Sequence, residues 1–363
     1  MNFEALVPFG WNAHFAQHFQ AYRDDDACTP GRVALEYNQF YRIYTANGEM
    51  LAETTGKLRY EAESRAELPA VGDWVVLKQR PDQANARIHA ILPRKSRFTR
   101  KVADRKTEEQ VVGANIDTVL LVTSLNQDFK PRRIERYVAV AVESGARPVL
   151  VLSKADLCAD LADKLAALAA LAAHLPIHAV SVKAGLGLDD LAQYFVEGQT
   201  VAILGSSGVG KSTLVNHLLG FDRQKVKEIR ANDGEGVHTT RHRELVMLPT
   251  GGLVLDTPGM REMQLWETDD GVGEVFSDVE LLIASCRFSN CGHQAEPGCA
   301  IRQALKDGSL TAARYDNYVK LQGELTHLAQ RQEDYTALKE RKQRWKKLAQ
   351  AGEERGRSKR QGR

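Results

Sequence analysis

The chain has 363 residues, 43% of them hydrophobic, and a formal net charge of only +2. This length suits two or three globular domains, and the even charge balance leaves no strong overall field to attract a charged partner. Residues 1–4 lack the basic segment of a signal peptide, and charged residues interrupt the alanine- and leucine-rich run near residue 165. These features argue against secreted and membrane-spanning proteins, and we expect a cytoplasmic location.

After an N-terminal extension, residues 1–30, a region of short alternating segments covers residues 31–100. Apolar and polar residues alternate in four segments, and Asn47-Gly48 is a strong signal for a hairpin turn. The segments are 32–37, 40–44, 72–77 and 86–92. The region as a whole predicts five or so short strands and a small β-barrel, for which the OB-fold is the natural candidate, a fold that often binds nucleic acid. The basic residues 94–101 then predict a linker that is either an RNA contact or only a solvated run of charge.

Residues 110–270 have the pattern of an α/β domain with a parallel sheet. Apolar runs at 118–123 and 148–152 predict buried strands on either side of a helix near residues 132–144. The second strand ends in Ser153-Lys154-Ala155-Asp156, which resembles the guanine-reading N-K-x-D motif of GTPases, with serine replacing the usual Asn or Thr. The Asp156 carboxylate can accept hydrogen bonds from N1–H and the 2-amino group of guanine, which adenine cannot supply.

A helix over 160–174 and a strand over 177–180 come next in the predicted order. They lead to Ser181-Val182-Lys183, which resembles the S-A-K loop that backs the guanine ring in GTPases. In that loop the functional group is the backbone N–H of the middle residue, so the replacement of alanine by Val182 is a mild change.

The most specific motif is a P-loop between an apolar strand at 201–204 and a helical pattern at 213–219. Its residues are Gly205, Ser206, Ser207, Gly208, Val209, Gly210, Lys211 and Ser212, followed by Thr213. Backbone N–H groups of such a loop bind a polyphosphate, the lysine reaches the outer phosphates, and the serine hydroxyl holds Mg²⁺.

Two further segments match the switch regions of GTPases. Thr239 or Thr240 completes the shell of Mg²⁺, and the spacing does not decide between them. A strand at 252–255 ends in Asp256-Thr257-Pro258-Gly259, where Asp256 faces Mg²⁺ through water and the Gly259 N–H meets the γ-phosphate. The motif order along the chain is therefore base, base, P-loop, switch one and switch two, which is a circular permutation of the usual order.

Many GTPases have a glutamine directly after the glycine of this motif, where it orients the attacking water. This chain has Met260 at that position. We therefore expect slow intrinsic hydrolysis. His238 is a candidate for orienting or deprotonating the water, and the alternative is that it only shapes the loop.

A metal site is predicted over residues 286–299. Cys286, Cys291, His293 and Cys299 supply three thiolates and an imidazole, a set that suits structural Zn²⁺. The other two cysteines, Cys28 and Cys158, are far apart and do not suggest a disulfide framework.

The C-terminal residues 336–363 are predicted to be a basic tail, helical at first and then disordered. Eleven Lys or Arg residues against three Glu give residues 339–363 a net charge of +8. Such a tail suits a phosphate backbone, and a solubilising role is the alternative.

Together these motifs resemble the bacterial family of ribosome small-subunit-dependent GTPase A. The resemblance covers an OB-like barrel, a circularly permuted P-loop GTPase domain at 110–270 and a mostly helical zinc-binding domain at 271–335. It implies a monomeric factor that binds the 30S ribosomal subunit and its 16S rRNA with GTP, hydrolyses GTP when stimulated and leaves with GDP. The motifs alone also allow a GTPase that acts on another RNA, such as tRNA, or a nucleotide-gated RNA-binding adaptor with incidental hydrolysis.

Overall fold

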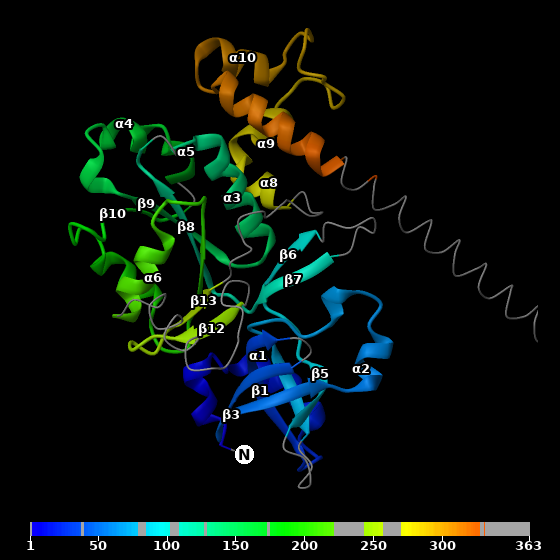
Figure 1. Cartoon of the computed structure of the whole chain (residues 1–363). Helices are drawn as coiled ribbons and strands as arrows, with labels where there is room; N and C mark the ends of the chain where they lie inside the picture. Colours follow the sequence, from blue (N-terminus) through cyan, green and yellow to red (C-terminus); the bar gives the residue numbers. More distant parts are fainter. Residues whose placement is uncertain are drawn as a thin grey trace, which may run out of the picture.

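The computed structural model describes residues 2–37, 40–78, 85–101, 109–126, 129–172, 175–220, 243–256, 270–326 and 330. Within these residues a barrel, a mixed sheet with flanking helices, and a helical C-terminal region follow one another along the chain (Figure 1). None of the helices in these ranges is both long and apolar enough to cross a lipid bilayer.

The barrel has five strands, as the alternating segments predict. They are β1 (Cys28–Tyr37), β2 (Phe40–Thr45), β3 (Gly48–Thr54), β4 (Trp74–Lys78) and β5 (Ala86–Ile91). The pairing order is β1-β2-β3-β5-β4, and β4 pairs back with β1 to close the barrel. Thr45 pairs with Gly48, so the predicted hairpin turn is present, and Gly48 has the positive φ of 106° that such a turn requires. A short helix not predicted from the sequence, α2 (Gly56–Glu61), connects β3 to the η3 turn (Arg65–Glu67) before β4.

The N-terminal segment packs against the barrel through aromatic side chains. Its elements are η1 (Glu4–Phe9), α1 (Ala13–Phe19) and η2 (Gln20–Tyr22). Trp11, Phe15 and Phe19 are buried with Trp74 of β4, and the Trp11 and Trp74 rings meet edge to face. The segment is therefore part of the folded barrel.

Arg32 ties this segment to the rest of the molecule from a fully buried position. Its guanidinium donates hydrogen bonds to the carbonyls of Phe9, Gly72 and Asn115. Burial lowers its pKa to about 10, although the nearby negative charges of Asp117 and Asp73 act to raise it. The side chain joins three segments that are remote in sequence.

The first residues of the basic run at 94–101 contradict both interpretations of the sequence, which were an RNA contact and a solvated run of charge. Arg94 makes a bidentate ion pair with the buried Asp73 and donates to two further carbonyls, so it is a structural residue. Ser96 is also buried, because its hydroxyl bonds with the backbone of Ile116. The run continues into a two-stranded hairpin of β6 (Arg97–Lys101) and β7 (Glu109–Ala114).

The central sheet is parallel, as its apolar runs predict. Its strands, in spatial order, are β10 (Ile177–Val180), β9 (Arg147–Ser153), β8 (Thr118–Ser124), β11 (Thr200–Leu204) and β13 (Leu253–Asp256), with β12 (Glu244–Met247) antiparallel at the end. Every residue of β8 and β11 is buried. The helices and turns of this region are α3 (Pro131–Glu143), η4 (Ala155–Leu157), α4 (Leu161–Ala166), α5 (Ala169–Ala172), η5 (Asp189–Tyr194) and α6 (Lys211–Leu219).

The single helix predicted at 160–174 is wrong, because the structure has α4 and α5 with a turn between them. The backbone N–H groups of Leu168 and Leu171 bond to carbonyls three residues earlier, which tightens the chain. This arrangement buries both leucines.

The barrel and the central sheet are joined edge to edge. Leu35 of β1 pairs with Glu244 of β12, so the strands of both units form one continuous ladder. Arg42 of β2 forms an ion pair with Glu244, and the Tyr44 hydroxyl donates to the Leu245 carbonyl at 3.0 Å. The strand that follows predicted switch one is therefore fixed to the barrel.

The C-terminal region is helical and attaches to α3. It contains α8 (Asp270–Val275), α9 (Ser277–Ala284), α10 (Ala300–Asp307) and a last helix at 312–326. Arg314 donates to Asp278 through two bonds of 2.7 Å and to Glu135 of α3 at 2.7 Å, while its guanidinium lies over the Phe276 ring. Such charge-assisted bonds bind the last helix and α9 to the central unit.

Candidate functional site

The P-loop connects the buried strand β11 to helix α6. Gly205 has a φ of 148°, and a Cβ atom there would lie 2.1 Å from the Val122 carbonyl oxygen of β8. Only glycine allows this approach of the loop to the sheet. Gly208 and Gly210 have φ values of 79° and 100°, and Gly210 is the N-cap of α6. The glycines therefore set the path of the loop that the motif predicts.

Lys211 is held against its own loop. Its ammonium donates to the carbonyls of Gly205 at 2.7 Å and Ser206 at 2.5 Å, beside the N-terminus of α6. A helix N-terminus and a fixed ammonium both favour negative charge at this point. Ser212 and Thr213 are exposed on the first turn of α6, whereas Leu214 and Val215 behind them are buried. The arrangement can bind the phosphates of a nucleotide from one side.

The loop after β9 is bonded directly to the P-loop. The buried Ser153 hydroxyl donates to the Val209 carbonyl at 2.6 Å, and Lys154 Nζ donates to the Gly208 carbonyl at 2.8 Å. Lys154 has the left-handed φ of 59°, a conformation uncommon for a residue with a side chain. Asp156 lies exposed in the following η4 turn. Serine thus makes a bond to the P-loop from the position at which GTPases usually have Asn or Thr.

The loop after β10 lies beside the loop after β9, because Val180 and Ser153 are partners in the parallel ladder. The Ser181 hydroxyl is buried and accepts a bond from the Ala184 N–H at 3.1 Å, which closes a tight turn. Val182 is partly exposed and Lys183 is exposed on this turn. Both predicted base-binding loops therefore lie at the carboxyl edge of the parallel sheet from which the P-loop also extends, where such sheets bind ligands.

Asp256 is the last residue of β13, whose preceding residue Leu255 pairs with Ala202 of β11. The backbone of Asp256 thus ends a strand adjacent to the one that leads into the P-loop. The predicted switch residues His238, Thr239, Thr240, Gly259 and Met260 lie outside the described residues, as does the basic tail at 336–363.

The four predicted metal ligands come together between α9 and α10. The ligand atoms of Cys286, Cys291, His293 and Cys299 all lie within 4.8 Å of one another. His293 Nδ1 is 3.6 Å from Cys286 Sγ and 3.5 Å from Cys299 Sγ. Tetrahedral zinc with bonds of about 2.3 Å to sulfur and about 2.05 Å to nitrogen would place these atoms about 3.6 Å apart. The cluster can therefore hold one tetrahedral metal ion.

Backbone groups favour the thiolate form of Cys286. Burial opposes ionisation of this thiol, but hydrogen bonds from the N–H groups of Ala300 and Ile301 and from the other two thiols act against it, and the pKa of Cys286 is lowered. Tyr315 of the last helix stands edge-on to the His293 ring.

Glu296 was not identified from the sequence, although it organises the loop that carries two of the ligands. Its carboxylate accepts hydrogen bonds from the N–H groups of Gly292, Gln294 and Ala295. These backbone donors, with its own N–H, lower the pKa of Glu296. An acidic residue between the turn residues Gly292 and Pro297 was the available signal.

Known proteins resemble this chain over most of its length. A family model described as RsgA GTPase matches residues 91–266. The chain is 46% identical over 354 residues to the small ribosomal subunit biogenesis GTPase RsgA of Opitutus terrae, which covers 95% of this chain and 96% of the relative. It is 48% identical over 297 residues to RsgA 2 of Lactiplantibacillus plantarum, covering 82% and 83%.

Two crystal structures share the fold. YjeQ from Thermotoga maritima aligns with a TM-score of 0.62 at 27% identity, covering 82% of this chain and 99% of that one. YloQ, described as a circularly permuted GTPase, aligns with a TM-score of 0.58 at 26% identity, covering 84% and 96%. The predicted fold class is thus confirmed: a barrel, a circularly permuted GTPase unit, and a helical region with a Cys/His cluster.

Proposed function

Because the chain belongs to the RsgA GTPase family, and is therefore a GTP-hydrolysing enzyme, we propose that it acts in late maturation of the 30S ribosomal subunit. It binds the subunit with GTP, hydrolyses GTP when the subunit stimulates it, and leaves with GDP. Relatives of 46% and 45% identity carry the name small ribosomal subunit biogenesis GTPase. The observation that supports the GTPase part of the proposal is the pair of hydrogen bonds from Ser153 and Lys154 to the P-loop, which joins the predicted base-binding loop to the predicted phosphate-binding loop.

We assign the nucleotide roles from the motifs and from the loops that carry them. Asp156 selects guanine, and the turn of Ser181, Val182 and Lys183 backs the ring. Backbone N–H groups of residues 205–213 hold the phosphates, and Lys211 neutralises their outer charge. Mg²⁺, when bound, offsets the charge on the phosphate oxygens, and Ser212, Asp256 and one of Thr239 and Thr240 would hold it. The Gly259 N–H meets the γ-phosphate.

Turnover of the free enzyme is slow in this proposal, because Met260 cannot orient a water molecule. Either His238 or a group of the subunit supplies the missing contact. A group that completes a GTPase site in this way raises the rate by roughly 10³–10⁵ in related systems.

The cluster of Cys286, Cys291, His293 and Cys299 holds structural zinc in this proposal. The 3.5–3.6 Å spacing of His293 Nδ1 from two sulfurs supports it, as does a donor set of three thiolates and one imidazole. No open ligand position is left, so the ion stabilises the fold and takes no part in hydrolysis.

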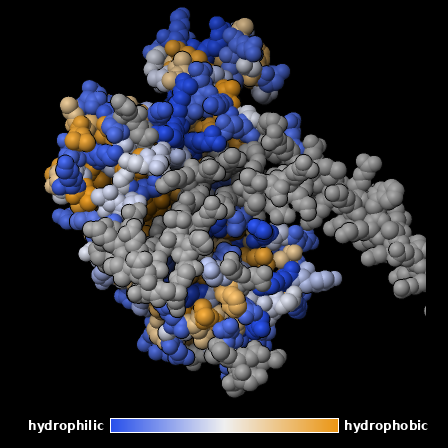
Figure 2. Space-filling view, in the orientation of Figure 1, coloured by the Kyte–Doolittle hydropathy of each residue, from blue (hydrophilic) through white to orange (hydrophobic). Residues whose placement is uncertain are grey.

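RNA contact is assigned to the barrel and to the basic tail. Tyr37, Phe40 and Tyr60 of the barrel are 41%, 41% and 91% exposed, and such side chains can stack on unpaired bases. Apolar residues lie exposed among hydrophilic ones over the barrel in the lower part of the space-filling view (Figure 2). We place the protein in the cytoplasm as a monomer that touches 16S rRNA with the barrel (31–100), the zinc region (271–335) and the tail on either side of the GTPase unit.

The test is single- and multiple-turnover GTP hydrolysis with purified 30S subunits, with 50S subunits as the matched control. We expect strong stimulation by the 30S subunit alone. Equal rates with and without it would exclude the ribosomal role, while stimulation by tRNA in its place would assign the enzyme to another RNA. Tight 30S binding with GTP but without faster hydrolysis would instead identify an adaptor.

A further inference from the structure

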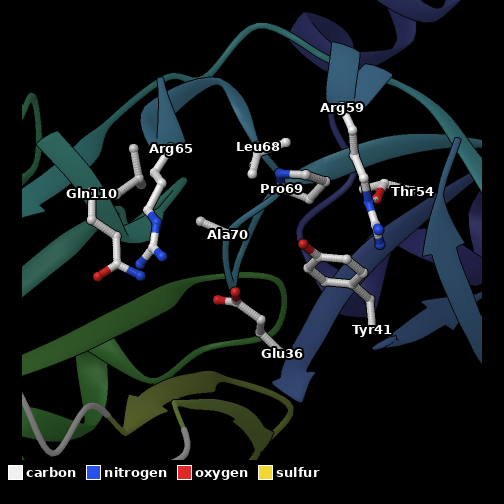
Figure 3. A pocket seen from close by; sticks show the side chains of 10 residues that line it. Glu36, Tyr41, Thr54, Arg59, Arg65, Leu68, Pro69, Ala70 and Gln110 are labelled. Carbon is white, nitrogen blue, oxygen red and sulfur yellow. Dashed lines mark hydrogen bonds between the residues drawn. The ribbon is translucent and has the colours of Figure 1, made fainter. Parts of the chain in front are cut away.

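A pocket of about 590 Å³ lies at one end of the barrel, distant from the P-loop in the chain. Its walls come from the end of β1, the start of β2, the end of β3, the segment between α2 and β4, and β7 (Figure 3). This volume is within the range of pockets that bind small ligands.

Tyr41 presents an unpaired hydroxyl to this pocket. The residue is only 4% exposed, and its hydroxyl points into the space between Arg59 and Glu36 (Figure 3). Within the part of the chain that the structure describes, this hydroxyl has no hydrogen-bond partner. Since the hydroxyl oxygen is accessible from the pocket, it can donate a hydrogen bond to a ligand that enters.

Two charged groups of opposite sign line the same space without pairing to each other. Glu36 is partly buried, and burial raises the pKa of its carboxyl against the charges of Arg243 and Arg65. Among the described residues, neither Glu36 nor the Arg65 guanidinium has a side-chain hydrogen bond or ion pair. The pocket thus offers a carboxylate acceptor, a hydroxyl and a guanidinium donor.

An apolar wall separates the two arginines of the pocket. Leu68 and Pro69 lie between Arg65 and Arg59 (Figure 3). The Arg59 Nε donates to the Thr54 hydroxyl, which fixes this cation at the end of β3. A flat ring can lie on the apolar wall while its edge reaches Glu36 and Tyr41, and an anionic group can lie near either arginine.

We propose that this pocket binds one unstacked guanine nucleotide. Glu36 accepts hydrogen bonds from N1–H and the 2-amino group, the two neighbouring donors that a carboxylate can meet together. The Tyr41 hydroxyl donates to O6, Leu68 and Pro69 contact the ring, and Arg59 or Arg65 binds the phosphate. The nucleotide is either free guanosine monophosphate or an unpaired guanosine of an RNA, and only the second source rests on the RNA contact proposed above.

The experiment uses the full chain with its GTPase site saturated by Mg²⁺ and GDP. Fluorescence anisotropy measures binding of two labelled RNA pentamers, UUGUU and UUUUU. We expect UUGUU to bind about tenfold tighter, the effect of one charge-assisted hydrogen bond. Glu36→Gln and Tyr41→Phe should each remove most of this preference. Lys57→Ala, which removes an 81% exposed cation from the same helix as Arg59, should weaken both RNAs equally.

Competition with guanosine monophosphate separates the two sources. Displacement of UUGUU by millimolar guanosine monophosphate supports a free-nucleotide site, and preference for UUGUU without displacement supports an RNA site. Equal affinity for the two pentamers overturns the inference, as does a preference that survives both Glu36→Gln and Tyr41→Phe. Stimulation of GTP hydrolysis by 30S subunits is measured in the same variants, so loss of base preference with intact stimulation disproves neither the GTPase role nor the ribosomal role. Absent stimulation with intact base preference would remove the proposed function and leave the pocket assignment standing.

Discussion

The proposed nucleotide site and the cysteine–histidine cluster are both built from tight turns, but the structures that support them differ. The nucleotide loops extend from β9, β10, β11 and β13, whose apolar side chains are mostly buried in a parallel sheet. In the segment 286–299, by contrast, only Cys299 is buried, and the loop connects two short helices. The nucleotide loops are therefore supported by a hydrophobic core, whereas the cysteine–histidine loop is organised around its own metal-ligand atoms.

Because of this difference in support, we expect the fold of the cysteine–histidine loop, but not that of the sheet edge, to depend on its ligand. Removing a nucleotide contact from the sheet edge leaves the strands packed, so binding and turnover change while the fold persists. With zinc bound as proposed, removing a metal ligand takes away free energy that holds the small loop, because such metal binding is coupled to folding. The Arg314 bonds to Asp278 and Glu135 lie outside this loop and should keep the helices attached.

The largest effect is expected for Cys291→Ala. The variant should lose the proposed zinc, and amide hydrogen exchange should show loss of protection confined to residues 286–299. The apparent free energy of structural zinc in small domains is about 10–16 kcal/mol for a complete ligand set. Cys28→Ala removes a buried thiol of the barrel and should keep full metal content. Elemental analysis that finds no zinc in native protein would refute the assignment.

Lys211→Ala tests the other half of the comparison. We expect GTP turnover to fall by at least about 10²–10³-fold, the cost of removing one preorganised charge-stabilising donor. The melting temperature should hardly change, because Lys211 serves the loop and the ligand. Lys320→Ala removes an exposed cation far along the chain and should leave basal turnover unaltered. A Lys211→Ala protein that is unfolded would show that the sheet edge also depends on this side chain.

Much of this contrast could be predicted from the sequence, because short-range patterns carry it. The P-loop, the strand that precedes it and the Cys/His spacing are each local, and long apolar runs reveal parallel strands. The barrel was predicted from alternation and one Asn-Gly turn. The positive φ values at Gly208 and Gly210 follow from the P-loop motif.

What the sequence did not reveal depends on contacts between distant segments. Arg94 looked like part of a basic surface run, but it pairs with Asp73, which is brought close only when the barrel closes. The pairing of Leu35 with Glu244 joins segments more than two hundred positions apart, and no local pattern marks it. At the break between α4 and α5 the N–H groups of Leu168 and Leu171 bond to carbonyls three residues earlier, and the alanine- and leucine-rich sequence does not mark this turn.

Asp156→Asn tests a single predicted contact of the nucleotide site, the one between the Asp156 carboxylate and guanine. The amide replaces an acceptor by a donor, so guanine nucleotides should bind about 10- to 150-fold more weakly, from about 1.5–3 kcal/mol for a hydrogen bond to a charged group. Xanthine nucleotides, with a carbonyl in place of the 2-amino group, should bind more tightly than to the native protein. Titration calorimetry with GDP and xanthosine diphosphate measures both changes. Equal competition by ATP and GTP in the native protein would contradict the role of Asp156.

The smallest effect is expected for Ser153→Ala, and it asks whether the bond between the two loops serves binding or only folding. The substitution leaves the Val209 carbonyl without its 2.6 Å donor, which should destabilise the protein by about 1 kcal/mol. Ser144→Ala is a matched control, because the buried Ser144 hydroxyl also donates at 2.6 Å, to the Ala141 carbonyl, away from the nucleotide loops. Thermal unfolding should therefore shift similarly in both variants. Only Ser153→Ala should also weaken GDP binding, by about fivefold, because Val209 belongs to the P-loop and must keep its path for the phosphate contacts. Equal GDP affinity in the two variants would mean that the sheet alone fixes the loops, and that the serine contributes to stability without organising the site.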